Sequence, residues 1–248
     1  MDLHPLKTAV PYSIRQQLSD GMVADFYEKL QKAVRSEIEI TIETPLGPMP
    51  IQVFDTWGYV DYPGQTVKYE PVLMNELANQ LDEESIYYDI GSRWGIFTKL
   101  ALKMGVKPQK IHGFESDQDN FNLLKKNHID DEIHLTKDFV GEDTLRLDEY
   151  VNNYAKPTTM KIDIEGAEAR ALRGANELLN SENLMLFIEI HPVYIKEFGD
   201  HQGDICSLLN NKGFNIDICT DNRMDEYTWR SIEDVDLPET GDYLIKAH

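Results

Sequence analysis

The pattern of apolar and polar positions divides the chain into two zones. In the first zone, apolar residues recur at steps of three to five positions between Ile14 and Val34, which predicts a helix. Residues 37–55 hold two alternating runs around a Pro-Leu-Gly-Pro turn, which predicts a β-hairpin. A second helix is predicted over residues 69–81, because proline is favoured at the first helical position and Pro71 stands there.

In the second zone, from Ser85 onward, strand and helix patterns alternate. Such alternation is typical of an α/β fold, in which helices cover both faces of a mainly parallel sheet. We therefore predict a doubly wound, mainly parallel sheet of seven strands. The predicted strands cover residues 85–90, 110–115, 132–135, 158–164, 184–191, 214–219 and 242–247. The predicted helices cover residues 94–104, 117–127, 146–154, 167–180 and 203–212.

Composition limits the partners and the location. The formal net charge of −20 argues against a nucleic-acid partner, because binding a phosphate backbone requires a basic surface. No apolar run approaches the ~20 residues of a membrane helix, and the first residues lack the charged-then-apolar pattern of a signal peptide. The sequence therefore predicts a cytoplasmic protein with neither a nucleic-acid nor a membrane partner. Cys206 and Cys219 lie in apolar segments and are expected to be reduced core residues.

Residues that can take part in ligand binding or catalysis gather where the strands are predicted to end. In open α/β sheets, ligands bind beyond the carboxyl ends of the strands. The strand that begins this zone leads into Asp89, Gly91 and Gly95, and glycines at such a turn let a ligand approach the backbone closely. The spacing is not GxGxxG, and a tight strand–helix turn explains the two glycines equally well. Glu115 follows 24 residues after Gly91, where a nucleotide site places the acid that binds the ribose hydroxyls.

Two later strands also end in acidic residues. Asp163 and Glu165 stand at the end of one predicted strand, and Glu189 and His191 stand at the end of the next. Burial of an unpaired carboxylate is costly, so these acids are expected either to cap a helix or to face a cleft. In the capping alternative, Glu165 and Glu168 only complement the dipole of the helix that follows.

These residues belong to longer motifs. The motifs are YEP (69–71), YYDIGSRWGIFT (87–98), FESDQDNFNLLKKN (114–127), TLRLDEY (144–150), MKIDIEGAEARALRGANELL (160–179) and MLFIEIHP (185–192). In order and spacing over roughly 180 residues, they resemble the FkbM family of S-adenosylmethionine-dependent methyltransferases. The segment KIDIEGAE is the most specific part of the resemblance. Ser92, Arg93 and Trp94 depart from it, because the family usually has a small residue, an asparagine and an aliphatic residue there.

The resemblance implies a fold, a cofactor and a reaction. It implies a methyltransferase domain over residues 69–248 whose sheet ends in an antiparallel strand. Residues 1–68 lie outside the resemblance and are expected to form a helix and hairpin extension that caps the substrate or supports a homodimer. The implied methyl donor is S-adenosylmethionine, which suits an acidic site because it carries a positive sulfonium and no phosphate. The implied reaction is O-methylation of a small-molecule or glycan acceptor.

The resemblance also implies roles for individual residues. The expected cofactor-binding residues are Asp89, Gly91, Gly95, Glu115, Ser116, Asp138 and Phe139. Asp89 is expected near the methionine and the ribose, Glu115 on both ribose hydroxyls, and Asp138 with Phe139 at the adenine. The expected catalytic residues are Asp163, Glu165, Glu189 and His191.

A metal ion is a separate question at this site. If the two strands are neighbours, Asp163, Glu189 and His191 resemble an open metal triad. Because the strand ends there and Pro192 follows, the side chains can instead diverge, with His191 bonded to Glu189 or to a backbone carbonyl. The sequence therefore predicts metal-independent transfer, in which His191 orients or deprotonates the acceptor and activity rises through pH ~6.5.

Two other functions remain open on sequence alone. The chain would be a non-catalytic cofactor-binding or interaction protein of the same fold if Arg93 and Trp94 prevent catalysis at the site. A nicotinamide-dependent oxidoreductase is disfavoured, because the chain lacks both GxGxxG and a Tyr-x-x-x-Lys pair. Tyr194, Tyr227 and Trp229 lie in loops expected near the acceptor and would suit a sugar face, although packing is the commoner explanation.

Overall fold

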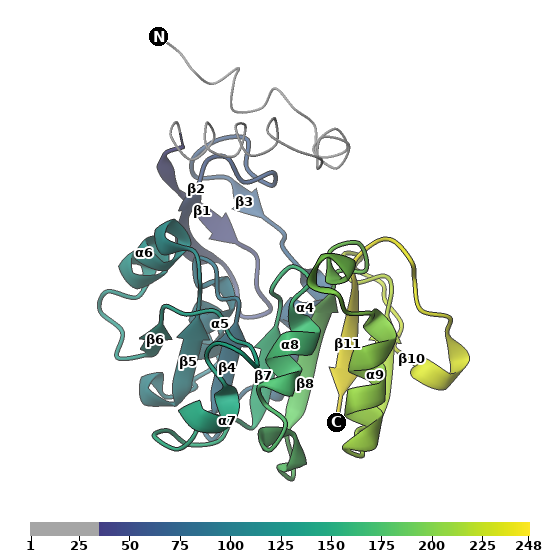
Figure 1. Ribbon diagram of the computed structural model, residues 1–248. Helices are drawn as coiled ribbons and strands as arrows, with labels where there is room; N and C mark the ends of the chain where they lie inside the picture. Colours follow the sequence, from purple (N-terminus) through teal and green to yellow (C-terminus); the bar gives the residue numbers. More distant parts are fainter. Residues whose placement is uncertain (1–34) are drawn as a thin grey trace. The chain divides into compact units, whose positions relative to one another are not determined.

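The computed structural model describes residues 35–248 (Figure 1). The helix predicted between Ile14 and Val34 lies outside the described residues. Contacts divide the chain into two compact units. None of the helices within residues 35–248 combines the length and the hydrophobicity that are needed to cross a membrane.

The smaller unit is built on the predicted hairpin. Of the described residues, it comprises 35–43 and Pro48–Lys68. Strand β1 (Glu37–Ile42) pairs antiparallel with β2 (Met49–Phe54), so the hairpin prediction is confirmed. A third strand, β3 (Thr66–Val67), pairs parallel with β1. The sequence did not predict β3, because two residues are too few to show an alternating pattern.

The larger unit holds a mixed sheet of eight strands. Its strands are β4 (Tyr87–Ile90), β5 (Ile111–Phe114), β6 (His134–Thr136), β7 (Thr159–Ile162), β8 (Met185–Ile190), β9 (Ile216–Cys219), β10 (Arg230–Ser231) and β11 (Tyr243–Ala247). The order across the sheet is β10-β9-β11-β8-β7-β4-β5-β6. The strands from β8 to β6 pair in parallel, whereas β11 is antiparallel to both β8 and β9. The α/β fold and the antiparallel last strand are confirmed. The predicted count of seven strands is wrong, because the two-residue β10 adds an edge strand.

Helices connect the strands largely where the sequence predicts them. The α-helices are α4 (Pro71–Gln80), α5 (Ile96–Lys103), α6 (Gln118–Asn127), α7 (Leu147–Tyr150), α8 (Glu168–Arg173) and α9 (Gln202–Asn211). The 3₁₀ helices are η1 (Pro108–Lys110), η2 (Leu178–Asn180), η3 (Ile195–Phe198) and η4 (Ile232–Asp234). The prediction of one helix over 167–180 is wrong. The α8 helix ends before Gly174, and the Asp148 carboxylate accepts hydrogen bonds from the backbone N–H groups of Glu177 and Leu178, where η2 begins.

Helices pack on both faces of the larger sheet, and alternation along the strands decides which side chains meet which helix. In β4, Tyr88 points to the face where the ring of Tyr150 in α7 packs edge-on, 5.8 Å away between centroids. Asp89 points to the opposite face, where Lys161 of β7 is its register partner. On that face, the ring centroid of Phe97 in α5 lies 5.3 Å from Lys161 Nζ. A buried charged pair therefore lies between the sheet and α5.

Candidate active site

The predicted catalytic residues come from neighbouring strands. In the sheet, β7 lies between β4 and β8 (Figure 1), so the carboxyl ends of these three strands meet at one edge. Asp163 directly follows β7, Glu189 lies in β8, and His191 directly follows β8. The structure therefore brings the predicted residues together at the end of the sheet where ligands bind in α/β folds.

Lys161 lies at the centre of this edge, and sequence reasoning assigned it no role. Its side chain is 2% exposed, and its Nζ lies 3.3 Å from Asp89 Oδ1 and 3.3 Å from Asp163 Oδ2. The same Nζ donates a hydrogen bond of 2.9 Å to the carbonyl of Gly91. Burial alone would lower the pKa of Lys161, but the two carboxylates raise it above its ordinary value. Lys161 is therefore charged and holds β4 and β7 together. The sequence offered one indication of this role, because a residue two positions before Asp163 lies on the same face of the strand.

His191 is fixed by a buried glutamate. Its Nδ1 lies 2.9 Å from Glu168 Oε1, and Glu168 is fully buried and also accepts a hydrogen bond from Gly166 N. His191 Nε2 lies 3.7 Å from both Asp163 Oδ1 and Glu165 Oε2. Burial would lower the pKa of His191, but the hydrogen bond to Glu168 and the nearby carboxylates raise it to about 10. The carboxylates around His191 therefore favour its protonated form while no cation is bound, and its expected role of orienting or deprotonating the acceptor stays a prediction.

The same contacts correct two details of the sequence interpretation. The expected partner of His191 was Glu189 or a backbone carbonyl, and the observed partner is Glu168. The interpretation of Glu168 as only a dipole-complementing residue in the first turn of α8 is therefore incomplete. A carboxylate that is buried and bonded to both a histidine and a turn positions those groups.

A strained turn separates β7 from α8. Glu165 and Gly166 both have positive φ angles, +53° and +105°. A Cβ on Gly166 would lie 2.6 Å from the backbone carbon of Tyr194, so only glycine fits there. The Glu165 side chain is 71% exposed, whereas the Asp163 side chain is 18% exposed. Asp163 is thus the more enclosed of the two acids that end this strand.

Arg223 joins Glu189 to a further acid, Glu70, and neither Arg223 nor Glu70 was assigned a role from the sequence. Arg223 Nη2 donates to Glu189 Oε1 over 2.8 Å, and its Nη1 donates to Glu70 Oε1. Burial raises the pKa of Glu70 to about 7, although Arg223 acts in the opposite direction. Asn222 also donates to Glu189 Oε1, over 3.4 Å. The signal for Glu70 was its place in the YEP motif.

We name these acids together the carboxylate cluster, because Lys161, His191 and Arg223 link them. Its members are Glu70, Asp89, Asp163, Glu165, Glu168 and Glu189. Together with these three basic side chains, it lines the edge formed by β4, β7 and β8. A site of this charge suits a positively charged ligand.

Glu115, the predicted ribose-binding acid, is buried at the end of β5. Its Oε2 accepts a hydrogen bond of 2.9 Å from Arg93 N, and its Oε1 accepts one of 2.7 Å from Asp117 N. Burial raises the pKa of Glu115, and these two backbone bonds oppose the rise. Because a carboxylate oxygen has two lone pairs, each oxygen keeps one for a ligand hydroxyl. The next residue, Ser116, is exposed.

The remaining predicted cofactor residues have local explanations. A Cβ on Gly91 (φ +82°) would lie 1.9 Å from the carbonyl oxygen of Asp163, and one on Gly95 would lie 2.6 Å from His128 Nε2. Both glycines therefore permit close packing within the protein. Asp138 is exposed and accepts a hydrogen bond from Phe139 N. The half-buried Phe139 ring stacks on Phe198 of η3, at 6.5 Å between centroids.

Two of the loop aromatics hold the 221–240 segment against α4. Tyr227 Oη and Trp229 Nε1 both donate to Glu76 Oε1, over 3.1 and 3.0 Å. The packing alternative therefore holds for these two residues. The ring of Tyr194 instead lies 6.3 Å from that of His191 and remains close to the carboxylate cluster.

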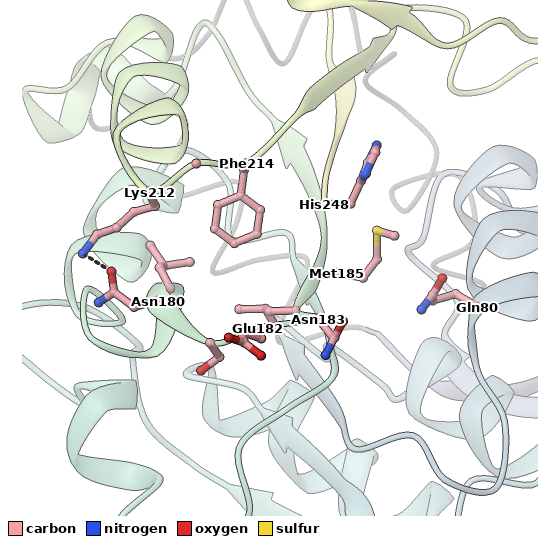
Figure 2. Close-up of a pocket in the computed structure, with 12 residues that line it drawn as sticks. Gln80, Asn180, Glu182, Asn183, Met185, Lys212, Phe214 and His248 are labelled. Atoms are coloured by element: carbon pink, nitrogen blue, oxygen red, sulfur yellow. Dashed lines mark hydrogen bonds between the residues drawn. The ribbon is translucent and has the colours of Figure 1, made fainter.

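A cavity of about 450 Å³ lies at the opposite end of the sheet (Figure 2). Met185 begins β8 here, and Lys212 bonds to Asn180 Oδ1 over 3.2 Å at the rim. The lining residues are Gln80, 179–185, 212–214 and His248. The cavity lies at the amino end of β8, away from the carboxyl-end edge, and contains none of the predicted site residues.

One family model matches the chain. Residues 131–216 match the model described as Methyltransferase FkbM domain. This segment includes β7, α8 and β8, and therefore Asp163, Glu189 and His191. No curated protein matches the chain.

Several solved structures resemble the fold. Precorrin-6y C5,15-methyltransferase from Geobacter metallireducens is 12% identical over 83% of this chain and 98% of its own, with a TM-score of 0.50. Methyltransferase FkbM from Methylobacillus flagellatus is 17% identical over 67% of this chain, with a TM-score of 0.46, and the match covers 44% of that chain. Fibrillarin from Aeropyrum pernix, solved with natively bound S-adenosylmethionine, is 13% identical over 67% of each chain, with a TM-score of 0.44.

Proposed function

Residues 131–216 match the FkbM methyltransferase domain, and from that premise we propose that the chain transfers the methyl group of S-adenosylmethionine to a hydroxyl of a small-molecule or glycan acceptor. The observation that carries the proposal is the carboxylate cluster within and beside the matched segment. S-adenosylmethionine has a cationic sulfonium and an ammonium group but no phosphate. Acids at the carboxyl ends of β4, β7 and β8 therefore suit its charge.

The residues present fit this methyl donor in two further respects. Glu70 Oε2 is buried and accepts no hydrogen bond from any described residue, so it can receive one from a ligand N–H group. Glu115 is oriented by Arg93 N and Asp117 N and keeps one lone pair on each oxygen for the two ribose hydroxyls. When bound, the donor supplies an electrophilic methyl carbon on a positively charged sulfur.

Asp163 is the residue that we propose to face the acceptor. Burial would raise its pKa, but Lys161 and His191 act more strongly together and keep it below its usual range. Asp163 therefore stays ionised and can accept a hydrogen bond from the acceptor hydroxyl, whose proton it takes as the oxygen–methyl bond forms. Much of the remaining catalysis is positioning, since methyl transfer is an in-line displacement.

Cofactor binding is the first test of this proposal. We expect calorimetry to show micromolar binding of S-adenosylmethionine and no binding of NAD. Glu115→Gln replaces one acceptor oxygen by an amide donor, and at about 1.5–3 kcal/mol for a hydrogen bond to a charged group it should weaken binding at least tenfold. Glu132→Gln is the matched control, because Glu132 is exposed and bonds to Gln109.

The outcomes separate the possible functions. No binding of S-adenosylmethionine by the wild-type chain would refute the proposed function. Binding with no release of S-adenosylhomocysteine across a panel of sugars and other hydroxyl acceptors would favour a non-catalytic binding protein. Equal affinity in wild type and Glu115→Gln would place the ribose elsewhere.

A further inference from the structure

We propose that Asp163, Glu189 and His191 form a binding site for one divalent metal ion. The ion's catalytic meaning rests on the proposed function, because the site lies where the acceptor hydroxyl would bind. Each of the three residues offers a ligand atom, and these atoms all lie within 4.8 Å of one another. Around an octahedral ion with bonds of about 2.1 Å, adjacent ligands lie about 3.0 Å apart and opposite ligands about 4.2 Å apart, so the three ligand atoms would have to move closer together to bind one ion.

The orientation of His191 is the second observation that points to an ion. A histidine that binds a metal usually donates its other ring N–H to a carboxylate, which fixes the tautomer and aims the free nitrogen at the metal. Glu168 Oε1 lies 2.9 Å from His191 Nδ1 and can take that role. His191 Nε2 then points toward Asp163, and at 3.7 Å it makes no hydrogen bond within residues 35–248. This nitrogen, on a side chain that is 5% exposed, faces Asp163 and Glu165, and an ion bound there would displace the proton that these carboxylates favour.

The two carboxylates each keep an oxygen for the ion. Lys161 pairs with Asp163 Oδ2, while Asp163 Oδ1 faces His191. Arg223 bonds to Glu189 Oε1, and Glu189 Oε2 has no hydrogen-bond donor among the described residues. The basic side chains therefore fix the carboxylates from one side without using both oxygens. Asp163 is 18% exposed at its side chain, so an ion has access from solvent.

This geometry removes two of the grounds for expecting metal-independent transfer, although the resemblance to the FkbM family still supplies no metal motif. These two grounds were that Glu189 and His191 diverge where β8 ends, and that His191 bonds to Glu189 or to a backbone carbonyl. Instead, both residues converge on Asp163, and His191 bonds to Glu168.

Two carboxylates and one imidazole favour Mn²⁺ or Mg²⁺, with Zn²⁺ as a competitor for the nitrogen. A bound ion would act as a Lewis acid on the acceptor oxygen and ease the loss of its proton to Asp163 or solvent. The ion neither gains nor loses electrons in this role.

The test is a Mn²⁺ titration of the full, chelator-treated chain, followed by electron paramagnetic resonance. We expect one Mn²⁺ per chain. Asp163→Asn and His191→Asn should each weaken binding at least tenfold, and Glu168→Gln should weaken it 10- to 100-fold through the orientation of His191. His248→Asn and Asp217→Asn are matched controls, because this His–Asp pair lies 3.3 Å apart, away from the site, and should leave binding unchanged. Circular dichroism identifies any variant that fails to fold, and Glu189→Gln then serves as a second ligand variant.

The inference is wrong if the wild-type chain binds no Mn²⁺, Mg²⁺ or Zn²⁺, with or without S-adenosylmethionine. It is equally wrong if an ion binds but every variant of the three ligands keeps wild-type affinity. Binding of S-adenosylmethionine by the metal-free chain is measured in parallel. A chain that binds the cofactor but none of the three ions would refute this inference alone, and a chain that binds an ion but no cofactor would refute the proposed function alone.

Discussion

Replacement of Lys161 by methionine should strongly destabilise the larger unit. Methionine keeps an unbranched side chain but removes the charge that faces Asp89 and Asp163, each at 3.3 Å. At an effective dielectric constant of 20, each contact is worth about 5 kcal/mol before the cost of desolvation. Removal of one partner from a buried ion pair typically costs about 3–5 kcal/mol net. Lys161 is 2% exposed and Asp89 fully buried, so we expect a loss within that range.

The assay is urea unfolding followed by circular dichroism, with thermal unfolding beside it. A loss of about 3–5 kcal/mol is a large part of the 5–15 kcal/mol of a typical domain, and at about 2–4 °C per kcal/mol the midpoint should fall by roughly 6–20 °C. The double variant Lys161→Met/Asp89→Asn should recover part of the loss, because it no longer buries the Asp89 charge. Lys212→Met is the matched control, since Lys212 bonds only to the neutral Asn180 among described residues.

The result that would refute this reasoning is a Lys161→Met variant within about 1 kcal/mol of wild type, the range of an exposed ion pair. A double variant no more stable than the single one would show that the lost stability comes from packing, not from the unpaired charge of Asp89.

Three shorter predictions follow. Burial and His134 lower the pKa of His112 to about 3, so the neutral form of His112 stabilises the folded chain fully above pH ~6.5, and this stabilisation falls as the pH drops toward 3. Between pH 7 and 5, the free energy of unfolding in urea should therefore fall by about 2 kcal/mol more in wild type than in His112→Phe. Gly91→Ala should abolish soluble expression, because its Cβ would meet Asp163 O, whereas Gly105→Ala, with an equally positive φ and open space, should express normally. Asp163→Asn should lower turnover about 10²-fold with a secondary-structure spectrum like wild type; unchanged turnover would make Asp163 structural.

Periodicity predicted the larger sheet well, because most of its strands are separated by helices of a different period. The β4, β5 and β7 strands are buried along their whole length, and apolar or aromatic residues hold at least half of the positions in each. The misses were elements that periodicity cannot show. Strands β3 and β10 have two residues each, and they form through tertiary pairing rather than through a local pattern.

The acids of the site could be predicted from the sequence, but their partners could not. Asp163 and Glu189 were visible because a carboxylate at the end of an apolar strand is unusual. Lys161 was hidden inside such a strand, and its meaning depends on Asp89, which is 72 positions away in the sequence and adjacent in the sheet. Arg223 lies in an acidic loop and pairs with Glu70 from 153 positions away. Such pairings depend on topology, which composition and spacing do not encode.

The place of β11 has a consequence for the order in which the protein folds during synthesis. In the sheet, β9 pairs with β11 and β10 but not with β8, because β11 lies between them. While the ribosome makes residues 191–242, the outer edge of β8 has no partner strand, and β9 cannot join the sheet. An unpaired edge strand is a template for association with other chains. The nascent chain therefore exposes the β8 edge to association until Tyr243–Ala247 can pair with it, and a chaperone that covers β8 would be useful throughout that interval.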